Sequence, residues 1–207
     1  MANTELDSLK NEDIEKAPAP SSKPYIYDGH VAIHADISGV TIRAKGNIVA
    51  MGDCEDCALE SELGTVFLLY GSLQDTRIKA KVNIYVKHSM KSQLEAGNDI
   101  IIEKHMMMSD LRAWRGVISE SPEAKIVGGI TIAGETIVVD AIGNENQVRT
   151  AVSVMKDTGV ILCNRIYPQV SLSVGRVVRL FREEHPGGNI SCKDGRMHIV
   201  DRQPHDT

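Results

Sequence analysis

The chain has 207 residues, a net charge of −5, 42% apolar residues and only 4% aromatic residues. This length allows one long domain or two small ones, and the scattered basic residues argue against a nucleic-acid-binding face. No apolar run approaches the roughly 18 residues of a membrane-spanning helix, and the acidic, polar N-terminus differs from a signal peptide. We therefore expect a cytoplasmic protein without a transmembrane segment.

Residues 1–24 are predicted to form a flexible N-terminal tail. Residues 16–24 are rich in Pro, Ala and Ser and lack periodicity, which is typical of an extended linker. The preceding residues 5–16 have the composition of a short frayed helix that buries little. From Tyr25 onward the pattern becomes strand-like, with Asp28 and Gly29 as a turn.

A nine-residue phrase then recurs along the chain. Its clearest copies span residues 42–50, 78–86 and 94–102, and residues 131–139 keep its small residue and its apolar pair. The small residues that anchor the copies are 16 to 20 residues apart: Ala44, Ser61, Ala80, Ala96, Ala113 and Ala133. Because so short a unit cannot bury its own apolar face, the copies must stack on one another. The sequence therefore predicts an all-β solenoid of about six coils over residues 25–143.

Each copy contains its own inward positions and its own corner. The first apolar residue, the anchor and the later apolar pair alternate along the strands and are predicted to point inward. Gly-Asn or Asn-Asp follows the anchor in several copies, as at Gly97 and Asn98, and we expect a left-handed corner there.

Residues 144–200 are predicted to be strands and hairpins that cap or extend the stack. Alternating apolar runs are separated by turns at Lys156–Gly159, Pro186–Gly188 and Asp194–Gly195. A solenoid needs such a cap, because its last coil otherwise leaves an open edge. Residues 201–207 are predicted to be a polar tail.

The cysteines and other reactive residues do not form a recognisable site. Cys54 and Cys57 make a C-x-x-C pair, but Cys163 and Cys192 are too far apart to complete a zinc ribbon, so we interpret all four as free thiols. Trp114 is interpreted as a packing residue or an exposed contact. We predict no catalytic, cofactor-binding or metal-binding residue and no cofactor.

Several phrases, in a fixed order, carry a resemblance to a known family. They are AGNDIII at residues 96–102, IVGG at 126–129, AGETIVVDAIG at 133–143, RIYP at 165–168 and VSLSVG at 170–175. In this order they resemble the flagellar assembly protein A family over roughly residues 28–200.

The resemblance implies a right-handed parallel β-helix with chain ends that fold back on it. It also implies a cytoplasmic bacterial protein linked to flagellar assembly and to polar or cell-surface organisation, with no established active site. The chain departs from the larger members in two ways. Larger members have an N-terminal domain ahead of the coils, whereas this chain has a short tail there. Many members also carry a long coiled coil at the place where this chain has only a tight turn, Lys156–Gly159.

The leading functional hypothesis is a non-enzymatic scaffold. It would act through protein–protein contacts on the faces or ends of the solenoid, with self-association as one mode. The alternative is a carbohydrate-binding or polysaccharide-cleaving β-helix. Cleavage needs clustered carboxylates. Asp53, Glu55 and Asp56 are adjacent, but Asp75 is not expected in register with them, so we favour a solvated acidic corner. An acyltransferase is disfavoured, because no histidine lies within the hexapeptide-like residues 126–143.

Overall fold

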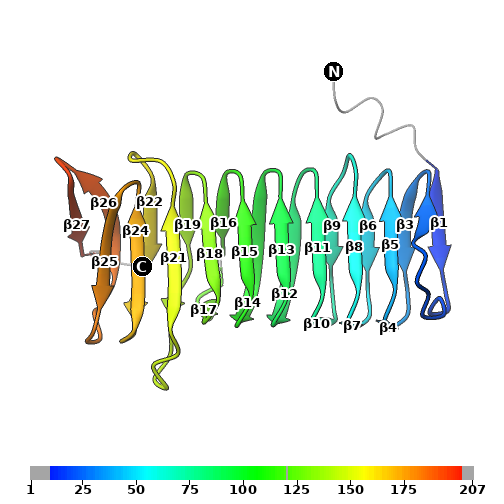
Figure 1. Ribbon diagram of the computed structural model, residues 1–207, viewed down its shortest axis with the longest axis horizontal. Coiled ribbons are helices and arrows are strands. Elements are labelled where there is room, and N and C mark those ends of the chain that lie inside the picture. Colours follow the sequence, from blue (N-terminus) through cyan, green and yellow to red (C-terminus); the bar gives the residue numbers. More distant parts are fainter. Residues whose placement is uncertain (1–9, 120, 202–207) are drawn as a thin grey trace.

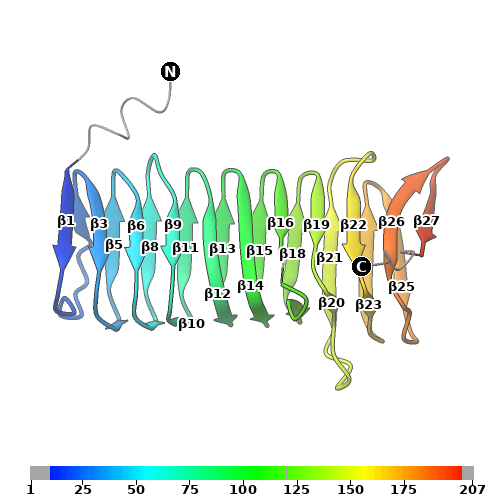
Figure 2. The same cartoon turned by 180° about the vertical axis from the view of Figure 1, so that it is seen from behind.

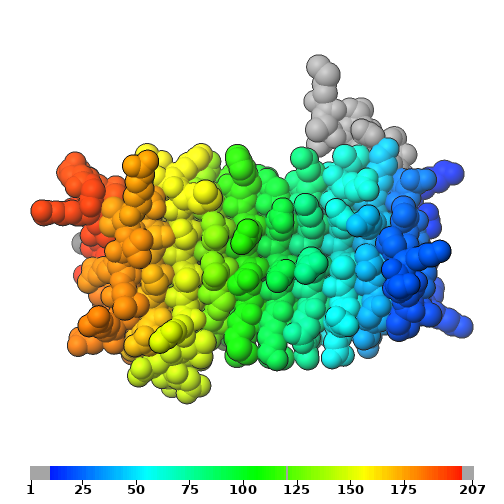
Figure 3. Space-filling view, viewed as in Figure 1, coloured from blue at the N-terminus to red at the C-terminus, as the bar shows by residue number. Residues whose placement is uncertain are grey.

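The chain winds into a long stack of β-coils (Figure 1), with strands on both sides of the stack. The buried apolar side chains form one narrow core between them. The computed structural model describes residues 10–119 and 121–201. Within them all regular structure is strand, arranged in a 10-stranded and a 17-stranded sheet. The stack makes about nine turns, and its path along the strands of Figure 1 is right-handed. The space-filling view shows one elongated body with its rows of side chains side by side (Figure 3).

The 10-stranded sheet takes one strand from each coil. Its strands pair in parallel from β2 to β24, and only the last pair, β24 with β25, is antiparallel. In order they are β2 (Tyr25–Tyr27), β5 (Thr41–Ala44), β8 (Ala58–Ser61), β11 (Arg77–Ala80), β13 (Gln93–Ala96), β15 (Asp110–Ala113), β18 (Ile130–Ala133), β21 (Thr150–Val154), β24 (Val170–Val174) and β25 (Val177–Phe181).

The 17-stranded sheet follows the rest of each coil in two columns (Figure 2). The first column holds β1 (Asn11–Ile14), β3 (His30–Ile33), β6 (Ile48–Ala50), β9 (Val66–Leu68), the start of β12 (Ile84–Met90) and of β14 (Asp99–Met107), β16 (Gly116–Ile118), β19 (Thr136–Val138), β22 (Val160–Cys163), β26 (Gly188–Lys193) and β27 (Arg196–Val200). The second column holds β4 (Ile37–Ser38), β7 (Cys54–Glu55), β10 (Ser72–Gln74), the ends of β12 and β14, β17 (Lys125–Val127), β20 (Ala141–Ile142) and β23 (Arg165–Ile166).

The six predicted anchors form one column of register partners inside the 10-stranded sheet, which confirms the predicted register. The prediction of about six coils is too low, because three further members of the column are larger residues that the pattern does not reveal: Tyr27, Val154 and Val174. In coil order the column reads Tyr27, Ala44, Ser61, Ala80, Ala96, Ala113, Ala133, Val154 and Val174.

The left-handed corner lies elsewhere than predicted. Residues with φ between 48° and 70° line up at the end of the second column, one per coil: Gly39, Asp56, Asp75, Lys91, Met108 and Gly128. Gly97 and Gly134, at the predicted corner, do not have a positive φ. They are glycines because a Cβ there would overlap the carbonyl oxygen of Lys81 or Trp114 in the preceding coil.

A column of buried hydroxyl groups follows the left-handed corner. Thr76 Oγ1 accepts a hydrogen bond from the backbone N–H of Cys57 at 3.4 Å. Ser92 Oγ accepts one from Thr76 at 3.1 Å, and Ser109 Oγ one from Ser92 at 3.2 Å. Each hydroxyl also donates to the carbonyl two residues before it. The column satisfies backbone donors that the corner takes out of the strand ladder.

The two ends of the stack differ. At the N-terminal end, residues 11–14 form β1, parallel to β3, so the predicted helix is wrong for these residues. At the C-terminal end, β25 and β26 turn back antiparallel to β24 and β22, and β27 pairs with β26. Phe181 and Ile190 of these strands are buried against the core.

Candidate functional site

A row of alternating charges runs along the outer surface of the 10-stranded sheet. The row is formed by register partners at the third position of each strand: Arg43, Glu60, Lys79, Glu95 and Arg112. Arg43 Nε lies 3.0 Å from a carboxylate oxygen of Glu60, and Lys79 Nζ lies 3.6 Å from Glu95. In the following coils the same position holds Ile132, Ser153 and Ser173, so the charged row ends at Arg112.

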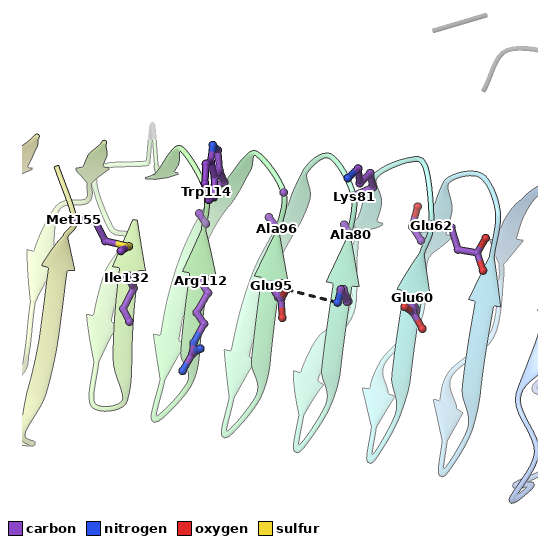
Figure 4. Close-up of a pocket in the computed structure, with 14 residues that line it drawn as sticks. Glu60, Glu62, Ala80, Lys81, Glu95, Ala96, Arg112, Trp114, Ile132 and Met155 are labelled. Atoms are coloured by element: carbon purple, nitrogen blue, oxygen red, sulfur yellow. Dashed lines mark ion pairs between the residues drawn. The ribbon is translucent and has the colours of Figure 1, made fainter. Parts of the chain in front are cut away.

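An exposed apolar patch begins where the charges end. Trp114 follows β15 directly and is 80% exposed, and Met155 follows β21 and is 69% exposed. Ile132 lies between them on β18 (Figure 4). We call these three residues the Trp114 patch. Together with Glu60, Lys79, Glu95 and Arg112 they line one open groove of about 1010 Å³.

Glycines isolate Trp114 from its neighbours. Gly97 and Gly134 occupy the equivalent position in the coils before and after it, as the hydrogen bonds Trp114 N–H to Ala96 O and Gly134 N–H to Ala113 O show. No side chain from either adjacent coil therefore lies beside the indole in this row. The indole ring therefore remains accessible to a ligand from the side of either neighbouring coil.

The C-x-x-C pair is inert in this fold. Cys54 and Cys57 are buried, and both are free thiols. Burial raises the pKa of the Cys54 thiol to about 12 and also raises the pKa of Cys57. Since the thiolate is the reactive form, neither is suited to redox or nucleophilic chemistry. Among residues 10–119 and 121–201, no three His, Cys, Asp or Glu side chains are placed to hold a metal ion.

The acidic corner is arranged differently from the prediction. Asp75 lies in register with Asp56 at the left-handed corner, so the expectation that Asp75 is out of register is wrong. Asp53 lies at another bend, where it accepts hydrogen bonds from the backbone and hydroxyl of Ser72 at 2.7 and 3.1 Å. Asp56 and Asp75 are exposed at the surface, which fits the interpretation of a solvated corner.

Two histidines lie side by side on the second column of the 17-stranded sheet. His88 and His105 are register partners, and their ring centroids are 5.8 Å apart. Burial, and then the neighbouring His105, lowers the pKa of His88. Lys125 continues this row in the next coil, so the row presents an imidazole pair and an ammonium group.

Sequence reasoning singled out Trp114 but missed its partners. Met155 is 41 residues further along the chain, and Ile132 has no feature in the sequence that distinguishes it from the other apolar strand residues. The register of the strands reveals the relation: Trp114 follows Ala113, and Met155 follows Val154, which is a member of the same column but was not detectable as an anchor in the sequence. Residues that follow successive anchors share one outer row, which brings these side chains together.

The comparison with protein families matches residues 26–161 to the Flagellar Assembly Protein A beta solenoid domain. The chain belongs to this family. The matched range contains the charged row and the Trp114 patch, whereas β23 to β27 lie beyond it. The comparisons with curated proteins and with solved structures give no match. The described part of the chain contains no helix long and apolar enough to span a membrane.

Proposed function

We propose that this chain is a non-enzymatic scaffold of the bacterial cytoplasm. Its role in flagellar assembly would be to hold other proteins on the outer faces of its solenoid. Membership of the flagellar assembly protein A family supports the proposed role in flagellar assembly. The Trp114 patch is the observation that carries the mode of action.

The patch has the composition of a protein-binding hot spot. Tryptophan is enriched among the residues that dominate binding energy, and an exposed apolar cluster next to charged residues is typical of an interaction site. The partner we propose is a protein segment that places apolar side chains on Trp114 and Met155. Its charged groups would meet the alternating row that ends at Arg112.

The acidic residues of the groove do not favour polysaccharide cleavage. Glu60 and Glu95 each form an ion pair with a basic neighbour, Arg43 and Lys79. A glycosidase instead needs a carboxyl group whose pKa is raised so that it can donate a proton. Paired in this way, these two glutamates are better suited to stabilising the face and to selecting a partner by charge.

The test replaces Trp114 with Ala in the full chain. Since the ring is exposed, we expect stability to change by less than about 0.5 kcal/mol, while flagellar assembly proteins that co-purify with the tagged chain are lost. Tyr70→Ala is the matched control, because Tyr70 is 73% exposed but lies outside the groove.

Two results would contradict the proposal. If the same proteins co-purified equally well with both variants, the Trp114 patch would not be the surface that binds partners. If Trp114→Ala instead abolished retardation of the chain in a polysaccharide gel, the carbohydrate-binding function would replace the scaffold.

A further inference from the structure

The outer surface of the 17-stranded sheet has an unbroken row of apolar side chains. One residue of each first-column strand from β3 to β22 points outward and lies beside its register partner in the next coil. We call this row the apolar ladder: Ala32, Val49, Phe67, Tyr85, Ile101, Ile118, Val138 and Leu162. All its members are at least partly exposed. Phe67 and Tyr85 stack with their ring centroids 4.9 Å apart.

Polar residues border the ladder. Asp13 lies beside Ala32 at its first end, and Asn189 lies beside Leu162 at its last end. Along one side, next to its midpoint, Lys87 and Glu103 form an ion pair at 3.7 Å. An apolar centre with a polar rim is the usual anatomy of a protein–protein interface.

The ladder and its rim together have the area that a stable dimer needs. Eight coils at about 4.8 Å each give a strip about 38 Å long. The ladder itself is one outward position wide; together with one outward position on either side of it, which belongs to the rim, the strip is about 20 Å wide, hence about 760 Å². A standard stable interface buries about 800 Å² on each partner.

The ladder is also complementary to itself. A twofold axis that lies within the interface, parallel to the strands and between β12 and β14, places Tyr85 on the partner's Ile101. It also places Phe67 on the partner's Ile118. Further out, every apolar residue again meets an apolar residue. The same axis places Lys87 opposite the partner's Glu103, because the two residues lie on the same side of the ladder in adjacent coils. Each copy would therefore contribute one half of two equivalent ion pairs.

We infer that two copies of this chain pair face to face through the apolar ladder, antiparallel, about this twofold axis. The inference rests on the proposed scaffold role, for which it names a second copy of the chain as one partner. The dimer would leave the 10-stranded faces of both copies on its outside, so that it presents two Trp114 patches.

The mass of the purified full chain, measured by light scattering over a range of concentrations, tests this inference. The chain has a mass of 22.6 kDa, and we expect twice that value. Ile101→Glu should give a monomer, because the dimer would bury the new charge without a partner. Lys87→Glu should raise the dissociation constant by about tenfold or more, because it places like charges opposite each other twice. Exchanging both residues, Lys87→Glu with Glu103→Lys, should restore the dimer.

Lys79→Glu is the matched control. It breaks an ion pair of the same kind between the same two coils, Lys79 with Glu95, but on the opposite face. It should leave the dissociation constant unchanged. Circular dichroism of every variant distinguishes loss of pairing from loss of the fold.

Three outcomes would overturn the inference: a monomer at all concentrations, a dimer that survives Ile101→Glu, or a dimer indifferent to Lys87→Glu. None of them bears on the proposed scaffold function, since mass is measured without other proteins and the Trp114→Ala test probes the opposite face. Conversely, loss of the scaffold function would leave the mass unchanged.

Discussion

Two buried hydroxyl groups in this core have opposite energetic roles. Ser92 Oγ accepts the backbone N–H of Thr76 at 3.1 Å and donates to the carbonyl of Met90 at 3.0 Å. Thr131 Oγ1 is equally buried but has no hydrogen-bond partner among the residues that the structure describes. A buried polar group stabilises only when it is paired, so the same deletion should have different effects at the two positions.

We expect Ser92→Ala to reduce the free energy of unfolding by about 1–3 kcal/mol, because it leaves a buried backbone donor unpaired. Thr131→Val keeps the shape and removes an unpaired hydroxyl, so it should be neutral or stabilising. Unfolding in urea, monitored by circular dichroism, measures both. Equal destabilisation by the two variants would show that the hydroxyl column does not hold the corner.

Individual strands depend on the small residues of the anchor column. Ala96 is 4% exposed and lies between Ala80 and Ala113 of the adjacent coils. Neighbouring coils are only about 4.8 Å apart, and the narrow interior leaves little room for a longer side chain. The size of the anchor therefore limits how closely the two sheets approach.

Ala96→Leu should cost about 1–3 kcal/mol through overpacking. Arg112→Leu adds a similar side chain on the adjacent strand, but on the outside, and should change stability by less than about 0.5 kcal/mol. Thermal and urea unfolding of both variants make the comparison. If Ala96→Leu had wild-type stability, the anchor column would not set the spacing of the sheets.

The sequence was informative about elements wherever small residues mark the repeat. From Ala44 to Ala133 the anchors predicted both the coils and their register. In the coils of Tyr27, Val154 and Val174 the same position tolerates a larger residue, so those coils escaped detection. The left-handed corner was misplaced because a glycine in this chain can mark either a positive φ or a close approach to the backbone of the adjacent coil. At Gly97 it avoids a clash with a carbonyl oxygen, whereas non-glycine residues such as Asp56 adopt the positive φ.

The outer rows were less predictable than the core for a physical reason. Which residues share an outer row depends on the number of residues in the bends of each coil. This number varies, because the anchors are 16 to 20 residues apart. The Trp114 patch and the apolar ladder therefore become visible only once the register of each strand is known.

For the whole molecule, the antiparallel strands at the C-terminal end are expected to prevent uncontrolled association. Removing residues 176–207 would expose the edges of β24 and β22, which pair with β25 and β26 in the intact chain. Unpaired edges with complementary backbone groups are templates for further strands. We expect the truncated chain to form particles of rising mass, seen by light scattering and electron microscopy.

The control for this truncation is a second truncated chain with lysine in place of Ser171 and Ser173 on the new edge strand. Charge on an edge opposes pairing, so its mass should stay constant. Should the first truncated chain also keep a constant mass, the C-terminal strands would have no protective role.

Because each coil contributes one residue to every row, the length of this molecule can change only in whole steps. Losing or gaining a complete coil would preserve the core column, the charged row and the apolar ladder, yet shift the Trp114 patch by about 4.8 Å relative to one end. An incomplete coil would turn inward-facing residues outward in every later strand. Distances between binding surfaces along this axis are thus quantised, and related chains that hold partners at different separations are expected to differ by whole coils.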